Sequence, residues 1–463
     1  MKKLKIVNSN KLYKKAIKII PGGSQTFSKG PSQFTNNFAP KYLKKGKGCN
    51  VWDEDDNKYI DYVMGCQPLI LGYSDREVNT AVQNQLKIGS TFSLMNKLEI
   101  DVAELLVKNI PSAEMVRFGK NGGDATTIAI KIARAVTGKQ KVAFCGYHGW
   151  HDWFIASTDK SNGIPNFNKK LVYSFEYNNL DSLEKIFEEN RDEIACVIME
   201  PITVPEPKCF TNNCKNKFCK ISDICKKNNF LHKVKEICKK NNSLLIFDEV
   251  VTGFRYSVGG AQEYYNVVPD LTALAKGISN GIPLSSIVGK KEYMKLLGDD
   301  VFFSFTYGGE CLGLAAAKAC ITKLIKNKVP NHLKIVGTIY KDGLNRIFKN
   351  YQLEDVLSCD GHPCRSIITI KDYKNYKNLE IKTFIQQELF RRGILWAAYH
   401  SLSFMHKKNH IKKTLNAFNE ISELLSKIIK GNLNINSKIE GDLVSPVFRK
   451  VSDFNSFIDK KKN

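Results

Sequence analysis

Two ionisable residues follow apolar segments and have side chains suited to catalysis. Asp248 directly follows the apolar segment 244–247, and Lys276 closes a later apolar stretch and enters a glycine-rich turn. A buried carboxylate is costly without a cationic partner, which a ligand or another part of the protein could supply. A lysine in apolar surroundings has a lowered pKa and can form a Schiff base, although a lysine by itself is more often solvated. The pair becomes informative only together with the residues around it.

Three further groups stand at similar positions. The turn Asn121-Gly122-Gly123-Asp124 opens a helical pattern, where backbone N–H groups and the helix dipole favour an anion such as phosphate. Such turns also occur before helices that bind nothing. Tyr147 and His148 follow an apolar segment and could stack on a flat ring, or could pack as an ordinary aromatic loop. Glu200 follows the apolar segment 195–199.

Together these groups match one cofactor, pyridoxal phosphate (PLP). The glycine turn would hold its phosphate, and Tyr147 would stack on its ring. Asp248 would pair with the pyridine N–H and keep the ring protonated, so that the ring acts as an electron sink. Lys276 would bind the aldehyde and later move a proton.

The elements that position these residues alternate between strand and helix from residue 115 to residue 290. This alternation predicts an α/β fold with a mostly parallel sheet covered by helices, in which ligands bind beyond the carboxyl ends of the strands. We expect an N-terminal segment (1–65) that joins a small lobe and a large domain (66–310) with an insertion at 204–229. A small α+β domain (311–440) and a basic tail (441–463) follow.

The sequence resembles the class III aminotransferases of fold type I, in the branch that contains glutamate-1-semialdehyde 2,1-aminomutase. The matching stretches are PGGSQTFSKGP (21–31), GCNVWDEDDNKYIDYVMG (48–65), LGY (71–73), FGKNGGDATTIAIKIARAVTGKQK (118–141), GYHGWHDW (146–153), IMEP (198–201), LLIFDEVVTGFRYSVGGAQEYYNVVPDLTALAKGISNGIPLSSIVG (244–289) and FSFTYGGECLGLAAA (303–317). They extend over roughly residues 15–430, and the segment 244–289 is highly specific.

The resemblance implies a fold type I enzyme whose Lys276 binds PLP and whose Asp248 pairs with the pyridine nitrogen. It also implies a homodimer with shared active sites. The other residues implied at the cofactor are Gly122, Gly123, Tyr147, His148, Glu200, Val250 and, reaching the phosphate of the other subunit, Thr306. The activity implied is amino transfer from an amino acid donor to a keto or aldehyde acceptor.

Two departures from the aminomutase pattern concern the substrate. PGG (21–23) is followed by SQTFSKGP, so Lys29 stands in a stretch where the aminomutase carries an arginine. Lys is a point charge, whereas Arg offers a planar fork to a carboxylate. The phosphate turn also lacks the family's hydroxyl side chains. The stretches KNGGDAT (120–126) and GYHGWHDW (146–153) together resemble a side branch of the family found in amino-sugar and surface-polysaccharide pathways. The alternative is the aminomutase of tetrapyrrole synthesis. Arg365 and Arg255 are further candidates for binding a substrate carboxylate.

The insertion after Glu200 carries four cysteines: Cys209, Cys214, Cys219 and Cys225. Four thiolates at this spacing could hold a structural zinc ion or an iron–sulfur cluster. The alternatives are free or redox-active thiols and, less favoured, disulfides. We expect none of these cysteines to be catalytic.

Composition excludes several other classes. Hydrophobic residues make up 43% of the 463 residues, so the chain can bury a large core. No apolar run is long enough to span a bilayer, and the N-terminus lacks a signal-peptide pattern, which favours a cytosolic enzyme without membrane partners. The net charge of +24 is spread along the chain without a nucleic-acid-binding motif, so we expect solvated surface and no nucleic acid partner.

Overall fold

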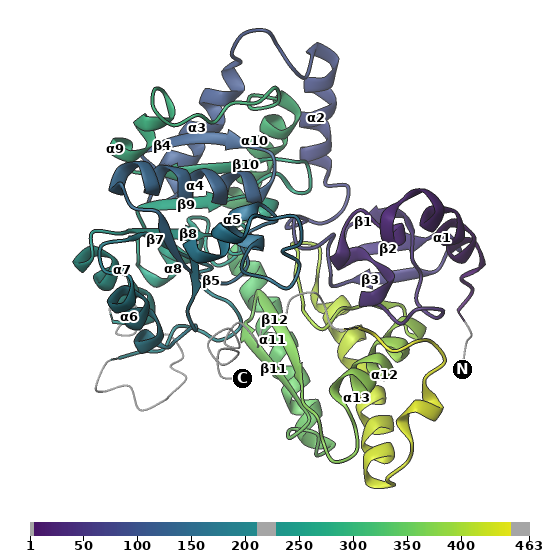
Figure 1. Cartoon of the computed structure of the whole chain (residues 1–463). Coiled ribbons are helices and arrows are strands. Elements are labelled where there is room, and N and C mark those ends of the chain that lie inside the picture. Colours follow the sequence, from purple (N-terminus) through teal and green to yellow (C-terminus); the bar gives the residue numbers. More distant parts are fainter. Residues whose placement is uncertain (1–3, 211–227, 446–463) are drawn as a thin grey trace. The chain divides into compact units, whose positions relative to one another are not determined.

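The computed structural model describes residues 4–210 and 228–445. Its internal contacts divide the chain into two compact units, which are drawn in Figure 1. The larger unit is Arg76–Pro330, and the smaller unit combines Met1–Asp75 with Asn331–Lys450. The helix α10 (Cys311–Lys326) packs on α2 (Arg76–Ile88) and α3 (Lys97–Asn109), so contacts place residues 311–326 in the larger unit.

The larger unit is built on a seven-stranded sheet of order β4-β10-β9-β8-β7-β5-β6. The strands are β4 (Met115–Gly119), β5 (Lys141–Cys145), β6 (Val172–Ser174), β7 (Ile194–Met199), β8 (Leu244–Asp248), β9 (Leu271–Leu274) and β10 (Ser285–Gly289). Only β10 runs antiparallel to its neighbours, β4 and β9, while the other pairs are parallel. The carboxyl ends of the other six strands therefore meet at one edge, and the predicted mostly parallel sheet is confirmed.

Helix α4 (Gly122–Thr137) lies across the sheet in contact with β7, β9 and β10 (Figure 1). Its apolar residues Ala125, Ile128, Ala129, Ile132 and Ala133, which share one helix face, are buried. Its C-terminus ends at Gly138 in the left-handed conformation, which glycine adopts without steric cost. The other helices of this unit are α5 (Asp152–Ile155), α6 (Leu180–Glu189), α7 (Phe230–Lys240), α8 (Gly260–Tyr265) and α9 (Lys291–Met294).

The smaller unit contains a four-stranded sheet of order β1-β2-β3-β13 and a separate hairpin of β11 and β12. Strands β2 (Asn50–Asp53) and β3 (Lys58–Asp61) pair antiparallel. The other elements are α1 (Val7–Ile19), β1 (Leu43–Lys47), α11 (Val329–Asn350), β11 (Leu357–His362), β12 (Arg365–Ile370), α12 (Asn378–Arg391), β13 (Ile394–Leu395) and α13 (Lys408–Lys430). Phe38, Val51, Tyr59, Phe390 and Leu395 form part of its core.

Three histidines lie buried in the smaller unit. Burial lowers the pKa of His362, His400 and His406 from 6.5 to about 3. The indole N–H of Trp396 donates to Nε2 of His400 at 2.9 Å, and the N–H of Ser403 donates to Nδ1 of His406 at 3.0 Å. Each of these two nitrogens therefore acts as an acceptor, as a neutral imidazole requires.

These histidines should make the protein acid-labile. Because the folded state keeps them neutral, only the unfolded chain gains protons as pH falls from about 6.5 towards 3, and stability falls with it. Each histidine contributes a slope of up to about 1.4 kcal/mol per pH unit. Urea unfolding measured between pH 7 and pH 4 should show this slope, and His400→Gln should make it shallower. An unchanged slope in that variant would show that His400 does not contribute.

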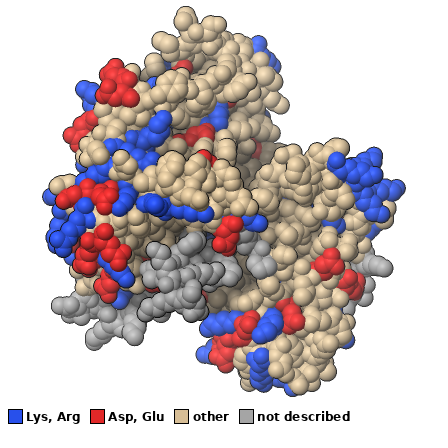
Figure 2. Space-filling model, viewed as in Figure 1, with Lys and Arg blue, Asp and Glu red and all other residues tan. Residues whose placement is uncertain are grey.

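On the face drawn in Figure 2, basic side chains form several separate groups, with acidic side chains among them over the larger unit. Within residues 4–210 and 228–445, no helix is long and apolar enough to cross a membrane.

Candidate active site

Five segments that carry the candidate site residues lie at the carboxyl edge of the large sheet. Moving along the sheet from β9 to β5, Lys276 follows β9, Asp248 ends β8, Glu200 follows β7, and Tyr147 follows β5. The glycine turn follows β4, on the other side of β10. The sheet order therefore brings together residues that are far apart in the sequence.

Asp248 is buried, with 3% of its surface exposed. One carboxylate oxygen accepts a hydrogen bond from the N–H of Val250 at 3.0 Å, and the other lies 2.8 Å from Nδ1 of His148. Nε2 of His148 is buried and has no hydrogen-bond partner among the described residues. A protonated imidazole would bury an unpaired N–H at that position, so the arrangement favours a neutral His148 that donates from Nδ1 to a charged Asp248.

The glycine turn forms the N-terminus of α4. Asp124 accepts from the N–H groups of Lys120 and Asn121 at 2.9 and 2.7 Å, which caps the helix. The N–H groups of Gly122 and Gly123 have no acceptor among the described residues, as expected for the first turn of a helix. These two N–H groups are available to an anion.

Packing requires glycine in this turn. A Cβ at Gly122 would lie 2.9 Å from Cγ1 of Val250, and a Cβ at Gly123 would lie 2.9 Å from the ring of His151. Val250 therefore lies against the turn, although 128 residues separate it from Gly122 along the chain. The sequence-predicted residues Gly122, Gly123 and Val250 are brought together.

Tyr147 and Glu200 are also neighbours. The N–H of Tyr147 donates to Oε1 of Glu200 at 3.0 Å, which fixes the loop after β5 against the end of β7. The Tyr147 ring packs edge-on against Phe154. Gly146 has φ +113°, and a Cβ there would lie 3.0 Å from the Glu200 side chain, so a larger residue would disturb this contact.

Lys276 is half-buried and has a left-handed backbone conformation, with φ +48°. This conformation is uncommon for residues other than glycine and often marks a functional position. The lysine opens a short 3₁₀ turn, Lys276–Ser279, whose other residues are buried. Its backbone is thus fixed by the surrounding fold.

Sequence reasoning missed Glu249, which is fully buried beside Asp248. Its carboxylate accepts from Thr252 Oγ1 and from the N–H groups of Ala261 and Gln262 at 2.8, 2.6 and 3.0 Å. Burial raises its pKa, and these hydrogen bonds oppose the rise. Glu249 anchors the chain that follows Asp248. In the sequence, the only indication of a role for Glu249 was its position directly after Asp248.

The remaining predicted residues are described here within the unit to which each belongs. Thr306 is exposed in the turn 306–309 of the larger unit. Arg365 begins β12 in the smaller unit and is half-buried, whereas Arg255 is fully buried in the larger unit. Lys29 belongs to the smaller unit, where its side chain is exposed.

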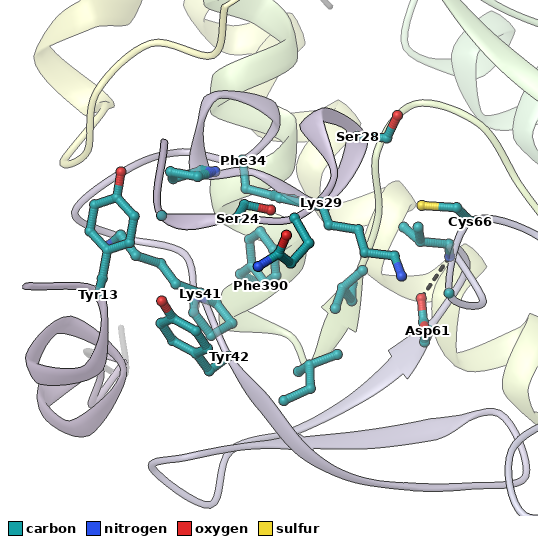
Figure 3. Close-up of a pocket in the computed structure, with 18 of the residues that line it drawn as sticks. Tyr13, Ser24, Ser28, Lys29, Phe34, Lys41, Tyr42, Asp61, Cys66 and Phe390 are labelled. Atoms are coloured by element: carbon teal, nitrogen blue, oxygen red, sulfur yellow. Dashed lines mark hydrogen bonds between the residues drawn. The ribbon is translucent and has the colours of Figure 1, made fainter. Parts of the chain in front are cut away.

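Lys29 lines a cavity of about 520 Å³ within the smaller unit, drawn in Figure 3. Phe34, Phe390 and Leu395 contribute apolar walls. The Lys29 side chain extends toward the end of the cavity where Cys66 and Asp61 lie (Figure 3). Lysine and an apolar wall in one cavity suit a ligand with an anionic group and an apolar part.

The two described ends of the cysteine-rich insertion lie side by side. Cys209 pairs with Asn229 in an antiparallel bridge, and the N–H of Phe230 donates to the carbonyl of Lys208 at 2.9 Å. Cys214, Cys219 and Cys225 lie outside the described residues. Among the described residues no group of three His, Cys, Asp or Glu side chains could hold a metal ion, so the zinc or iron–sulfur hypothesis has no structural support.

Comparison with known proteins agrees with this geometry. The sequence model of the family described as Aminotransferase class-III matches residues 34–421. The chain is 34% identical to 3-aminobutyryl-CoA aminotransferase of Cloacimonas acidaminovorans, over 90% of this chain and 97% of the relative. It is also 34% identical to glutamate-1-semialdehyde 2,1-aminomutase of Wigglesworthia glossinidia brevipalpis, over 90% of this chain and 98% of the relative.

Solved structures share the fold. The FumI protein of Sphingopyxis sp. MTA144, solved with PLP, matches with a TM-score of 0.81 and 24% identity, over 93% of this chain and 99% of that one. An omega-transaminase from Sphaerobacter thermophilus matches with a TM-score of 0.77 and 24% identity, over 90% and 98% of the two chains.

Proposed function

This chain belongs to the class III aminotransferase family, and from that premise we propose that the cluster around Lys276 and Asp248 is its active site. The chain is a PLP-dependent enzyme of fold type I. The observation that carries the site assignment is the gathering of Lys276, Asp248, Glu200, Tyr147 and the glycine turn at one edge of the sheet.

The residues at this edge fit PLP. Its phosphate suits the two unused N–H groups of Gly122 and Gly123, because a helix N-terminus attracts an anion. Its protonated ring nitrogen suits Asp248, a buried carboxylate that His148 and Val250 orient. Its aldehyde requires a lysine with a fixed backbone, which Lys276 provides.

When bound, PLP supplies an electron sink that stabilises negative charge at the carbon bearing the amino group. In this assignment, Lys276 would hold the cofactor through its side-chain amine and would move the proton at the substrate's α-carbon. Asp248 keeps its negative charge close to the ring nitrogen, and His148 holds that carboxylate in place by donating from Nδ1. His148 is thus assigned to orienting Asp248.

The remaining residues hold and enclose the cofactor. Val250, which lies against the glycine turn, and Tyr147 are proposed to contact the two faces of the ring. Glu200 holds the backbone of Tyr147 and faces the same loop. Burial of Asp248 strengthens its pairing with a cation, because the local dielectric is low.

We propose a homodimer with shared sites. The larger unit exposes a group of large apolar residues on α2, α3 and the segment between them: Leu86, Ile88, Phe92, Leu94, Met95 and Ile100. An apolar group of this kind is typical of a protein interface. Phe302 and Tyr307, which flank Thr306, are also exposed, in accord with a second subunit that covers this segment and receives Thr306 at its phosphate.

The proposed reaction transfers an amino group from an amino acid to a keto or aldehyde acceptor, and the acceptor could be a keto sugar. The relative named 3-aminobutyryl-CoA aminotransferase makes a 3-amino acyl thioester a second candidate substrate class. Lys29 and Arg365 are proposed to bind the substrate's anionic group. A cytosolic location remains a prediction from the sequence.

Half-reactions with single amines test this function. Purified enzyme should be mixed with one amine at a time, and conversion of the cofactor to its amine form followed by absorbance. The panel is L-glutamate, L-alanine, β-alanine, 3-aminobutyryl-CoA and glutamate-1-semialdehyde. A transaminase should release one keto or aldehyde product per site and then stop. Turnover of glutamate-1-semialdehyde with no second substrate would support the aminomutase instead, and no conversion by any amine would contradict the proposal for this panel.

Substitution of Lys29 tests its proposed role. Lys29→Gln should raise KM for the anionic substrate by about 10-fold or more and change kcat little, because a hydrogen bond to a charged group is worth about 1.5–3 kcal/mol. Steady-state kinetics would measure this change. Lys14→Gln, at an exposed position on α1, is the matched control. An unchanged KM in Lys29→Gln would remove Lys29 from the substrate site.

The metal hypothesis for Cys209, Cys214, Cys219 and Cys225 is tested by elemental analysis. If the cysteine spacing reflects a metal site, protein purified without chelator should carry about one zinc ion, or the iron and sulfide of one cluster, per chain. The metal should disappear when Cys214 and Cys219 are replaced by serine. Metal-free protein with full activity would show that these cysteines serve no metal.

A further inference from the structure

The segment 302–310, which carries Thr306, is tied at both ends to the β4–α4 region that holds the glycine turn. At its first end, Arg117 on β4 donates from Nη2 to the carbonyl of Phe303 at 3.2 Å. Lys131 on α4 donates from Nζ to the carbonyl of Phe302 at 3.0 Å. At its second end, Lys120 forms an ion pair with Glu310.

The Lys120–Glu310 pair is the contact nearest to the glycine turn. Nζ of Lys120 lies 2.8 Å from Oε2 of Glu310, and the two side chains are only 16% and 15% exposed. Glu310 also accepts from the N–H groups of Leu312 and Gly313 at 2.6 and 3.1 Å and so caps α10. Burial pushes the pKa of Glu310 up, but the hydrogen bond from Lys120, those from the two N–H groups and the Lys120 charge outweigh it and hold the pKa below its usual value. Glu310 therefore stays charged and joined to Lys120 at neutral pH.

The backbone of Lys120 is held at the glycine turn. Its N–H donates to Asp124 Oδ2, the same oxygen that accepts from the N–H of Asn121. Lys120 thus joins two helix N-termini, that of α4 at Gly122 and that of α10 at Cys311. If the N-terminus of one helix moves, the N-terminus of the other helix must move with it, or the half-buried Lys120–Glu310 ion pair must break.

The middle of the segment faces solvent. Phe305 and Tyr307 are 37% and 57% exposed, and Thr306 between them is exposed as well. The segment therefore has two tied ends and a free central part with two aromatic side chains. Such a part is suited to contact a second copy of the chain.

We propose that Lys120 is a positioning residue that couples the glycine turn to the segment 302–310, so that binding of the cofactor phosphate at the turn strengthens docking of a second subunit on that segment. The inference rests on the proposed function, which places the phosphate at Gly122 and Gly123 and the dimer contact at Thr306. Because coupling between two binding events is reciprocal, dimer formation must strengthen cofactor binding by the same factor.

The coupling is measured by the dimer dissociation constant of the full chain with and without PLP, by sedimentation velocity. In the wild type, PLP should tighten the dimer by about 5- to 150-fold, the usual range for such coupling. In Lys120→Gln, PLP should still bind, but it should tighten the dimer by a clearly smaller factor than in the wild type, because only the direct contact of Thr306 with the phosphate remains. Lys120→Arg should retain most of the coupling, because it keeps the charge. Lys141→Gln is the control, since it removes a lysine that is 19% exposed from its ion pair with Glu193 and should leave the coupling intact.

Hydrogen exchange of residues 302–310 provides a second readout, and its first comparison uses the wild-type protein alone. PLP should slow exchange in this segment of the wild-type protein and should do so less in Glu310→Gln. Wild-type exchange that PLP leaves unchanged, a wild-type protein that stays monomeric, or equal coupling in Lys120→Gln and the wild type would each overturn the inference. A wild-type protein that does not bind PLP would instead contradict the proposed function.

Discussion

Replacing Lys276 by alanine should lower amino transfer by at least about 10⁴-fold, the upper end of what a positioned acid–base group contributes. The variant loses both the amine that binds the cofactor aldehyde and the base that moves the substrate proton. It should also lose the visible absorbance band of the lysine–cofactor bond, although the phosphate and ring contacts still retain PLP. Single-turnover kinetics with the best amine of the panel would measure the loss.

The control for Lys276→Ala is Lys141→Ala. Lys141 is the first residue of β5, so it stands at the opposite edge of the same sheet from the cluster. This variant should keep nearly full activity and the absorbance band. If Lys276→Ala retained more than about a hundredth of wild-type activity, a loss at the lower end of the acid–base range, the assignment of Lys276 would be wrong.

Replacing Asp248 by asparagine should lower the rate by about 10³-fold, comparable to removal of one preorganised electrostatic contact in other active sites. The amide has nearly the same shape but lacks the charge that keeps the ring nitrogen protonated. His148 also loses its charged acceptor at 2.8 Å. The effect should appear in kcat with the best amine, whereas the amount of bound PLP should change little.

Two comparisons show whether the charge of Asp248 is responsible. Asp270→Asn removes a carboxylate that pairs with Lys290 just before β9, and it should leave the rate nearly unchanged. Loading Asp248→Asn with N-methylated PLP, whose ring nitrogen is permanently charged, should restore part of the rate. Failure of this rescue, together with a rate loss below 10-fold, would show that Asp248 does not act through charge.

Much of the larger unit could be predicted because its strands are short, apolar and followed by the polar residues that function requires. Strands 194–199 and 244–248 coincide closely with the apolar segments 195–199 and 244–247 of the sequence. The reversed direction of β10 could not be predicted, because an apolar run such as Ser285–Gly289 carries no information about the direction in which it pairs. The hydrogen bonds of Glu249 were equally hidden, since they depend on a turn that brings Ala261 and Gln262 back to it.

The gathering of the candidate residues at one edge of the sheet was predictable to the level of residue type. Each candidate side chain follows the carboxyl end of a strand. The strand order alone therefore brings these side chains to one edge of the sheet. The role of His148 was less visible, because a histidine beside an aromatic residue suggests contact with a ring. The structure instead shows Nδ1 directed at Asp248. The contacts of Lys120 with Glu310, 190 positions away along the chain, required the folded structure.

The most direct test of the central claim is to identify the residue that binds the cofactor. Purified enzyme would be reduced with borohydride, which makes the lysine–PLP bond permanent, then digested and analysed by mass spectrometry. The pyridoxyl group should be found on Lys276, and addition of an active amine before reduction should remove it. A pyridoxyl group on another lysine, or none on a protein that shows PLP absorbance, would contradict the assignment.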